Sequence, residues 1–267
     1  EYATLRGIAA NKKYDWCIPP FNIKGIENYS LDRAFTLPSV QERNLMILDN
    51  GHAPVVGERY FHFDKELFDL CPDHISLNGF FQTEKYFKHI EDEIRKEFTF
   101  HEDILEPCRE MVDSLDSAPI FLHVRRGDPN LVDPRGFKWS YTECSDQHPP
   151  QPLEYYEKAL ELFPEDVPVV VCSDSPEWVQ EQEIFKPDRF AISIPEDKYD
   201  DGSYEPFIDL CLMSLCSGAI IANSTMSWWG AWLQGGRGKV VAPKMWFGPA
   251  YPNNDTKDLY PEGWTLL

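Results

Sequence analysis

Four short apolar runs in the second half of the chain constrain its fold more than any other feature. They occupy residues 120–124, 167–172, 219–222 and 239–242. Each is rich in β-branched residues and lacks the apolar–polar alternation of a half-exposed strand, which is the pattern of strands buried on both faces. Helix-length segments separate them, at 152–163, 176–185 and 205–216. This alternation predicts a doubly wound α/β domain around a parallel sheet.

The first half of the chain has a different pattern. Short apolar segments there are interrupted by Pro, Gly and Asn, and one charged stretch, 84–98, has apolar residues at helical spacings of three to four. The opening residues, 1–10, have the composition of a helix interior. We therefore predict two α/β domains, an N-terminal one at 1–115 and a C-terminal one at 116–267.

Acidic residues outnumber basic ones by 45 to 25, so the net charge at neutral pH is −20. Such a field repels phosphate backbones and anionic lipids, which argues against nucleic acid and membrane surfaces as partners. An anionic ligand must therefore meet a local basic pocket. No apolar stretch approaches the ~20 residues of a membrane-spanning helix. We expect no span in this chain and a cytoplasmic, soluble protein, and we leave open whether an anchor precedes Glu1.

The seven cysteines are odd in number and widely spaced, and several lie inside apolar runs. This pattern indicates reduced thiols in the core rather than a disulfide framework. No Cys-x-x-Cys pair or Cys/His cluster has zinc spacing, so we expect no structural zinc.

Polar clusters follow three of the predicted strands directly. They cover 123–128, 172–178 and 223–232. An open parallel sheet binds its ligands at the carboxyl ends of its strands. Since all three clusters would meet at that edge, the sequence predicts a binding crevice there.

The first cluster delivers Arg125 and Arg126 to a strand end. A guanidinium can bind phosphate oxygens through two parallel hydrogen bonds and stays charged at any working pH. The alternative is that both arginines pair with Asp128 and other carboxylates and only fasten the loop. Because neighbouring strand residues point to opposite faces, Arg126 is the better candidate for that structural role.

The third cluster lies between a strand and a short aromatic helix. Its polar residues are Asn223, Ser224, Thr225 and Ser227. We expect hydroxyls to cap the helix and its unpaired backbone N–H groups to face outward, an arrangement that binds phosphate. Plain capping without a ligand remains an alternative. The tryptophans at 228, 229 and 232 fit core packing better than a sugar platform.

Two aspartates have two possible roles each. Asp209 lies in a segment that is apolar on nearly every side, so its carboxylate needs a partner. That partner is either a backbone or arginine group or the N1–H and 2-amino edge of a guanine. Asp174 follows a strand, and we expect it to cap the helix that begins at Pro176 or, as the second choice, to contact a ligand.

Two of these clusters resemble motifs of one family. His-Val-Arg-Arg-Gly-Asp at 123–128 is similar to the arginine motif that α-1,2- and α-1,6-fucosyltransferases share. Asn-Ser-Thr-Met-Ser-Trp-Trp-Gly-Ala-Trp-Leu at 223–233 is close to specific for the α-1,2 branch. Further similar segments include 79–87 and 243–247. The whole chain thus resembles the GDP-fucose-dependent α-1,2-fucosyltransferases, glycosyltransferase family 11.

The resemblance implies a GT-B architecture, in which two α/β domains face each other across a cleft. The C-terminal domain would be Rossmann-like and hold GDP-fucose, while the N-terminal domain would lie on the acceptor side. By motif, the donor site would consist of His123 and Asp209 at guanosine, Arg125 at the diphosphate, and Ser224, Thr225 and Ser227 at the phosphates, together with Arg126, Asp174 and Asn223.

The implied reaction is a single displacement with inversion, in which the 2-hydroxyl of a terminal galactose attacks C1 of fucose as GDP leaves. Arg125 and backbone donors near Ser224 would stabilise the leaving phosphate, so the resemblance implies no metal and no cofactor besides the donor substrate. A general base would assist the hydroxyl. The candidates are Asp128, Asp133, Glu143 and His148. We choose Asp128 as the general base, and a purely structural role, in which it bonds Arg125 or Arg126, fits this residue equally well.

The chain departs from the family pattern in three places. The family's Gly-x-Gly-Asn-Gln stretch precedes the Tyr-Ala pair at 2–3, so we expect that part of the site upstream of Glu1. Ser-Asp-Ser-Pro at 173–176 stands where the family often has Ser-Asp-Asp-Pro. The second aspartate of the family motif is thus replaced by serine, which leaves its role in this chain open. Pro129 and Asn130 follow Asp128 where the family often has Tyr, which leaves the loop geometry open.

Three rival functions stay open on the sequence alone. The first is an α-1,6- or protein-directed fucosyltransferase with the same donor pocket, against which the Trp-Trp-Gly-Ala-Trp segment argues. The second is a GDP- or glycan-binding protein without turnover. The third is a metal-dependent transferase, against which the lack of an Asp-x-Asp triplet at a strand end argues.

Overall fold

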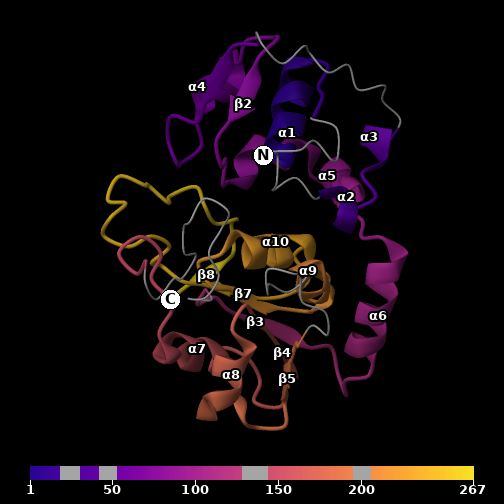
Figure 1. Ribbon diagram of the computed structural model, residues 1–267, viewed down its shortest axis with the longest axis vertical. Coiled ribbons are helices and arrows are strands. Elements are labelled where there is room, and N and C mark those ends of the chain that lie inside the picture. Colours follow the sequence, from indigo (N-terminus) through magenta and orange to yellow (C-terminus); the bar gives the residue numbers. More distant parts are fainter. Residues whose placement is uncertain (19–30, 42–52, 128–143, 195–205) are drawn as a thin grey trace. The chain divides into compact units, whose positions relative to one another are not determined.

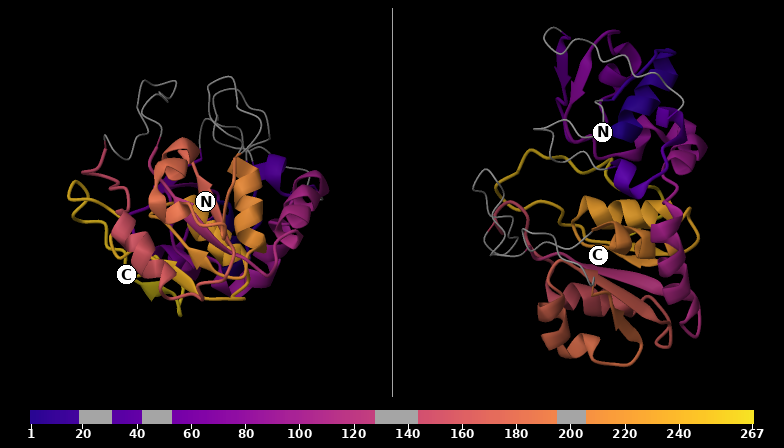
Figure 2. Two further views of the ribbon diagram at one scale, coloured as in Figure 1. Left: turned by 90° about the horizontal axis from the view of Figure 1, so that it is seen from below. Right: turned by 45° about the vertical axis from the view of Figure 1, so that its right-hand side comes forward.

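The computed structural model describes residues 1–18, 31–41, 53–127, 144–194 and 206–267. They fold as two compact units, drawn in Figures 1 and 2. The first unit consists of Glu1–His101 with Asn253–Glu262, and the second of Glu102–Pro252 with Gly263–Leu267. The functional division at residues 115 and 116, with an acceptor side and a donor side, stays a prediction.

The second unit is built on a six-stranded sheet. Its strands are β3 (Ile120–Val124), β4 (Val169–Ser173), β5 (Phe190–Ile192), β6 (Ala219–Ile220), β7 (Val240–Ala242) and β8 (Thr265–Leu266). Every pair is parallel, and the order is β5-β4-β3-β6-β7-β8. This confirms the predicted parallel sheet, and it adds two strands, β5 and β8, that the sequence did not indicate. The strand order reverses between β3 and β6, which is where such sheets bind ligands.

Helices cover both faces of this sheet. They are α6 (Glu102–Asp113), α7 (Leu153–Leu160), α8 (Pro176–Glu181), the 3-10 turn η3 (Glu183–Phe185), α9 (Pro206–Leu215) and α10 (Thr225–Leu233). Figure 1 shows α7 and α8 on one face and α9 and α10 on the other. All five residues of β3 and of β4 are consequently buried, which explains why their sequences do not alternate.

Side-chain alternation along β3 sorts its residues between the two faces. Ile120, Leu122 and Val124 pack in one cluster with Tyr155 and Tyr156 of α7. Because successive strand residues point to opposite faces, the side chains of residues 121 and 123 point toward α9 and α10. The strand thus presents an apolar face to α7 and a partly polar one to α9.

The first unit is a smaller α/β assembly. Its elements are α1 (Tyr2–Lys12), α2 (Leu31–Ala34), α3 (Pro38–Gln41), β1 (Val55–Gly57), α4 (Lys65–Leu70), β2 (Ser76–Asn78), the 3-10 turns η1 (Glu84–Tyr86) and η2 (Lys88–Ile90), and α5 (Glu91–Glu97). The strands β1 and β2 pair in parallel, and α4 connects them along the chain. The helix expected over 84–98 is present only as α5, since the first part of this stretch forms two 3-10 turns that end at Tyr86 and Ile90.

A buried ion pair ties α1 to α5. Arg6 Nη1 lies 2.9 Å from Glu97 Oε1, and both side chains are almost fully buried. The Tyr2 hydroxyl donates to Glu97 and accepts from Arg6, at 3.1 Å each. Since each charge has a partner and further hydrogen bonds, the desolvation cost of the pair is offset, whereas the loss of one member would strand the other.

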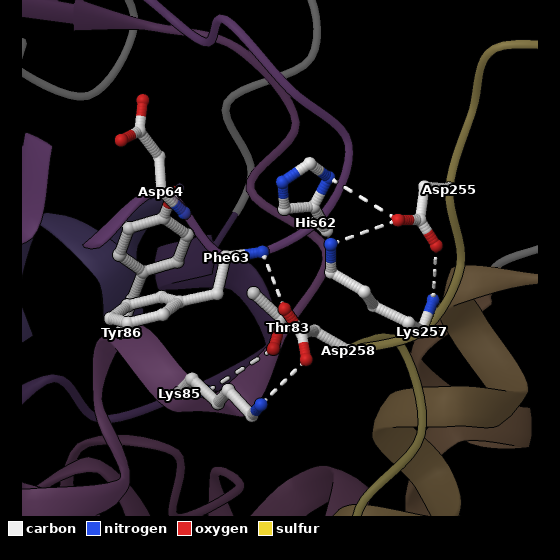
Figure 3. A network of polar contacts seen from close by, with 9 residues as sticks. All are labelled: His62, Phe63, Asp64, Thr83, Lys85, Tyr86, Asp255, Lys257 and Asp258. Carbon is white, nitrogen blue, oxygen red and sulfur yellow. Dashed lines mark hydrogen bonds and ion pairs between the residues drawn. The ribbon is translucent and has the colours of Figure 1, made fainter. Parts of the chain in front are cut away.

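The C-terminal stretch 253–262 returns to the first unit, and Figure 3 shows its contacts. Asp258 accepts from the backbone N–H of Phe63 at 3.1 Å and pairs with Lys85 Nζ at 2.5 Å. Asp255 pairs with Lys257 at 3.0 Å and lies 3.8 Å from His62 Nδ1. These contacts fix a late segment of the sequence onto the first hundred residues.

All seven cysteines are free thiols and five of them are buried, as the sequence predicted. Within the described ranges, no helix has both the length and the apolar character needed to cross a bilayer.

Candidate functional site

The three predicted polar clusters follow β3, β4 and β6, which are neighbours in the sheet. In β3 and β4, the register pairs His123 with Cys172 and Val124 with Ser173. The carboxyl ends of these parallel strands therefore lie at one edge. The polar clusters thus follow the carboxyl ends of the strands around the β3–β6 switch point, as predicted, and the binding crevice itself stays a prediction.

The loop after β3 is held in place by Asp174. Its carboxylate accepts from the backbone N–H groups of Arg126 and Gly127, at 3.0 and 2.7 Å. It also pairs with Arg125 Nη1 at 3.0 Å. Gly127 has φ +74°, a left-handed conformation that favours glycine and turns the chain at this point.

The prediction that Asp174 caps α8 is wrong. The N-cap residue of that helix is Ser175, and it makes no side-chain capping bond. The physical reason is that both carboxylate oxygens of Asp174 are used by the loop after β3, whose two amides and one guanidinium give stronger, charge-assisted bonds. Asp174 thus joins the ends of β3 and β4.

The two arginines have different environments. The Arg126 guanidinium lies over the Trp178 ring of α8, 3.9 Å from its centroid, and burial lowers its pKa. The sequence hypothesis paired Arg126 with carboxylates, whereas this contact is with an aromatic ring, and a contact of Arg126 with a ligand stays a prediction. The Arg125 side chain is about one-third exposed, at 30%, and pairs with Asp174 through one terminal nitrogen.

His123 and Asp209 lie on the same face of the sheet. His123 pairs in register with Cys172, and the Cys172 thiol donates to the Asp209 carboxylate. The His123 imidazole is 2% exposed, and burial, together with Arg125, lowers its pKa to about 4, so the ring is neutral at physiological pH. Its Nδ1 has no hydrogen-bond partner among the residues that the structure describes.

The Asp209 carboxylate has a partner that neither sequence hypothesis included. Ser193, which follows β5, donates its hydroxyl to Asp209 Oδ1 at 2.6 Å. Asp209 is 7% exposed, and burial raises its pKa to about 6 despite the bonds from Ser193 and Cys172. An ionised carboxylate held at this depth by hydroxyl and thiol donors can accept further donors, such as the N1–H and 2-amino group of a guanine.

The loop between β6 and α10 has buried polar side chains that mostly support the backbone. Asn223 donates from Nδ2 to the carbonyls of Pro149 and Trp246 and accepts from Gln151. Ser227, fully buried, donates to the carbonyl of Ser224 at 3.2 Å. These contacts hold the loop in shape. Asn223 and Ser227 are thus placed as supports of the helix start, and a direct contact with a ligand stays a prediction for both.

The predicted hydroxyl cap of α10 does not form. Ser224 is the N-cap residue, as expected, but it makes no side-chain capping bond within the described chain. Thr225, at the first position of the helix, is exposed. The first-turn N–H groups of a helix have no intrahelical acceptor, and a side-chain cap would have used one of them. Without that cap, the amides at the start of α10 suit an anion.

One general-base candidate can be placed. His148 lies close enough to Arg125 for that charge, in addition to burial, to lower its pKa. Its ring also packs against Phe247 and Tyr251, with centroids 5.5 and 5.6 Å away. The other three candidates, Asp128, Asp133 and Glu143, fall outside the described residues.

Several residues of the site were missed by sequence reasoning. Ser193, Trp178 and Gln151 each contact a predicted site residue. Tyr156, fully buried on α7, has a hydroxyl without a partner in the described residues, and the charges of Asp174 and Arg126 act on it. Only Trp178 carried a signal, because it lies in the polar cluster after β4; the others depend on contacts between distant segments.

The fold and the site are those of a doubly wound α/β protein with polar and charged side chains at the carboxyl ends of its parallel strands. The strand order, the guanidinium at the switch point, the uncapped start of α10 and the buried carboxylate together suit a purine nucleotide with phosphates. The sequence profile of glycosyl transferase family 11 matches residues 36–267. The chain therefore belongs to this family.

Known relatives agree with the family assignment. The chain is 32% identical over 201 residues to the O-antigen biosynthesis glycosyltransferase WbnK of Escherichia coli, covering 72% of this chain and 60% of WbnK. It is 25% identical to an alpha-1,2-colitosyltransferase of Escherichia coli, covering 92% of this chain and 87% of that protein. The human galactoside alpha-(1,2)-fucosyltransferase 1 is 27% identical, with 64% and 46% covered. The chain thus spans less than two thirds of WbnK and of the human enzyme.

Proposed function

We propose that this chain is an inverting fucosyltransferase that moves L-fucose from GDP-β-L-fucose to the 2-hydroxyl of a terminal galactose in a glycan. The observation that carries the proposal is the position of Arg125 directly after β3, the strand that neighbours β6 at the switch point, in a family of glycosyltransferases. The names of the relatives support the α-1,2 linkage. A GT-B arrangement of the two units is part of the same proposal.

Donor recognition follows from two sets of groups. Asp209 accepts from the guanine edge, and the neutral His123 lies beside it on the same sheet face. Arg125 binds the diphosphate, and the first-turn backbone amides of α10, from Thr225 onward, bind it at the start of that helix. In a chain with a net charge of −20, this arginine provides the local positive charge that a nucleoside diphosphate requires.

Catalysis depends on stabilising the leaving group. The acceptor hydroxyl attacks C1 of fucose while the C1–O bond to the β-phosphate breaks, and the negative charge that develops on GDP is met by Arg125 and by the α10 amides. These groups are fixed before the reaction, Arg125 by Asp174 and the amides by the helix. We propose that this positive charge takes the place of a metal ion.

The acceptor proton needs a base, and His148 is the candidate for which the structure gives an environment. A lowered pKa keeps its imidazole neutral at physiological pH, as a base must be. Asp128, the first choice from the sequence, stays a prediction together with Asp133 and Glu143.

The test is product analysis. The protein is incubated with GDP-fucose and a panel of β-galactosides, with and without EDTA, and the linkage of the product is determined by NMR. We expect fucose-α-1,2-galactose with and without EDTA. A 1,6-linked product would identify one rival function, a requirement for metal another, and GDP binding without transfer to any galactoside a third.

The matched variants are Arg125→Ala and Arg125→Lys. Losing the guanidinium in Arg125→Ala removes about 3 kcal/mol of transition-state stabilisation, or about a hundredfold in rate. The lysine restores the charge without the two parallel hydrogen bonds, so the rate of Arg125→Lys should lie between those of Arg125→Ala and the wild type. Unchanged transfer by Arg125→Ala contradicts the proposal.

A second donor belongs in the same assay because one relative that spans most of this chain is named an alpha-1,2-colitosyltransferase. Colitose is fucose without its 3-hydroxyl. If the GDP-linked colitosyl donor reacts faster than GDP-fucose, the site is one for a 3-deoxy sugar and the donor assignment changes.

A further inference from the structure

Phe80, the second residue after β2 in the first unit, is the most exposed of the large hydrophobic side chains in the described residues, at 73%. A single exposed apolar side chain is common on protein surfaces and needs no explanation. The backbone that displays Phe80 is, in contrast, held by unusual contacts. Those contacts indicate that the position of this ring has a use.

A carboxylate and a strained residue fix the turn. Glu58 accepts from the backbone N–H groups of Phe80 and Phe81, at 2.9 Å each, and burial raises its pKa. Phe81 has φ +50°, a left-handed conformation that is rare and costly for a bulky residue. Its side chain is buried and packs edge-on against Tyr86 at 5.6 Å. Phe81 thus anchors the turn while Phe80 points away from the core.

Hydrogen-bond acceptors accompany the exposed ring. Gln82, two residues after Phe80, has a buried Oε1 that accepts no hydrogen bond from the described residues. A buried acceptor without a hydrogen bond is unfavourable, so a ligand donor at this atom would recover free energy. Each Glu58 oxygen accepts one amide and has a further lone pair. The turn therefore combines an apolar ring with oxygens that accept hydroxyl donors.

A second ring lies at the end of the neighbouring strand. Gly57 of β1 pairs with Asn78 of β2, so the residues that follow both strands leave the same edge of the two-stranded sheet. Tyr60 is 50% exposed there and stacks on His62, with ring centroids 5.0 Å apart and 19° between planes. Carboxyl ends of parallel strands are the usual place for ligands.

We propose that Phe80 is the stacking platform of a sugar subsite in the first unit, which binds the galactose of the acceptor. A pyranose has an apolar C–H face, which packs on an aromatic ring, and a rim of hydroxyls, which donate to acceptors such as Gln82 Oε1 and Glu58. A protein partner would require roughly 800 Å² of surface on each side, far more than one turn offers. This inference rests on the proposed function for the identity of the sugar.

Direct binding is the first test. Lactose and methyl β-galactoside are titrated into the wild-type chain and into Phe80→Ala and Phe80→Trp, with saturation-transfer NMR as the readout. Leu70→Ala is the matched control, because Leu70 is 68% exposed in the same unit and lies outside the turn. We expect affinity at least tenfold weaker in Phe80→Ala and within threefold of wild type in the other two variants. Equal affinity in Phe80→Ala, or no binding of either sugar to the wild type, overturns the inference.

Kinetics separate this inference from the proposed function. If both are right, Phe80→Ala raises the KM for lactose at least tenfold and leaves the KM for GDP-fucose within twofold. Galactoside binding that depends on Phe80, without fucose transfer by the wild type, refutes the proposed function and keeps the subsite. Fucose transfer with a wild-type lactose KM in Phe80→Ala refutes the subsite and keeps the function.

Discussion

Arg125 and Asp174 form an ion pair, 3.0 Å from Nη1 to Oδ2, at the carboxyl ends of two adjacent strands. The same carboxylate holds two amides of the loop that carries the arginine. Asp174 thus positions the Arg125 backbone and side chain together. A diphosphate bound to Arg125 would meet a guanidinium that is already oriented, which lowers the ordering cost of binding.

Replacing Asp174 should therefore impair transfer, even though its carboxylate carries the same sign of charge as the diphosphate. We expect Asp174→Ala to lower kcat about a hundredfold, because Arg125 and the loop amides lose their common acceptor. Asp174→Asn keeps one acceptor oxygen, so its kcat should lie between those of Asp174→Ala and the wild type. Steady-state kinetics against GDP-fucose measures both, with Asp188→Asn on the exposed surface as the control. If Asp174→Ala binds GDP-fucose and transfers fucose like the wild type, the contacts of Asp174 are not needed to position the loop after β3.

Asp209 should make GDP affinity depend on pH. Its pKa is raised to about 6 by burial, and only the ionised form accepts from the guanine edge. GDP affinity should thus fall by up to tenfold per unit as the pH drops below about 6. Asp209→Asn should bind GDP at least tenfold more weakly at pH 7.5 and lose this pH dependence. Calorimetric titration at several pH values tests both, and a wild-type affinity that is flat from pH 7.5 to 5 would exclude the guanine contact.

The same carboxylate should lower stability in the ligand-free protein at neutral pH. Since its folded pKa exceeds its unfolded value of about 3.8, its contribution to the free energy of unfolding is full below pH 3.8 and is lost as the pH rises through about 6. Asp209→Asn should consequently unfold at higher denaturant concentration than wild type at pH 7.5, while binding GDP less well. Ser193→Ala, which removes a donor to the carboxylate, should be less stable.

His148 should control the acidic limb of the pH–rate profile. Burial and Arg125 lower its pKa, so the neutral form required of a base persists below its usual value near 6.5. His148→Gln should lower kcat about a hundredfold with little change in the KM for GDP-fucose. A kcat/KM profile measured from pH 5 to 8 provides the check. If His148→Gln keeps both the wild-type kcat and the acidic limb, the general base is Asp128, Asp133 or Glu143 instead.

Gly230 should be intolerant of alanine. In an exposed helix interior this change stabilises by up to about 1 kcal/mol, but a Cβ at Gly230 of α10 would lie 2.6 Å from Met213 Cβ of α9. Because Met213 is fully buried, the two helices would have to move apart. We expect Gly230→Ala to lower the free energy of unfolding by about 1–3 kcal/mol. Urea denaturation measures it, and a more stable variant would contradict the close approach of α9 and α10.

The strands and clusters that could be predicted were those with a local signal. The run at 120–124 is apolar without alternation and became β3 with the same bounds. β5 was missed because Phe190–Ile192 is three residues long and only partly buried. The helix α6 was missed because it contains Pro107 and many acids, whereas packing against α9 stabilises it.

The partners of the site residues could not be predicted because they depend on register and on distant segments. The lone aspartate in an apolar helix showed that Asp209 needed a partner, yet Ser193 meets it only because β5 pairs beside β4. Likewise, the sequence around Asp174 is compatible with a helix cap. The β3–β4 register instead brings the amides of Arg126 and Gly127 within its reach.

The chain passes between its two compact units three times, after His101, after Pro252 and after Glu262. No single cut can therefore release either unit intact. A fragment that starts at residue 102 would carry 253–262 without the Phe63 and Lys85 groups that bind Asp258, and one that stops at Pro252 would lose β8 from the sheet edge. Chimeras that exchange the first unit among family members will thus need to transplant 253–262 together with the first hundred residues.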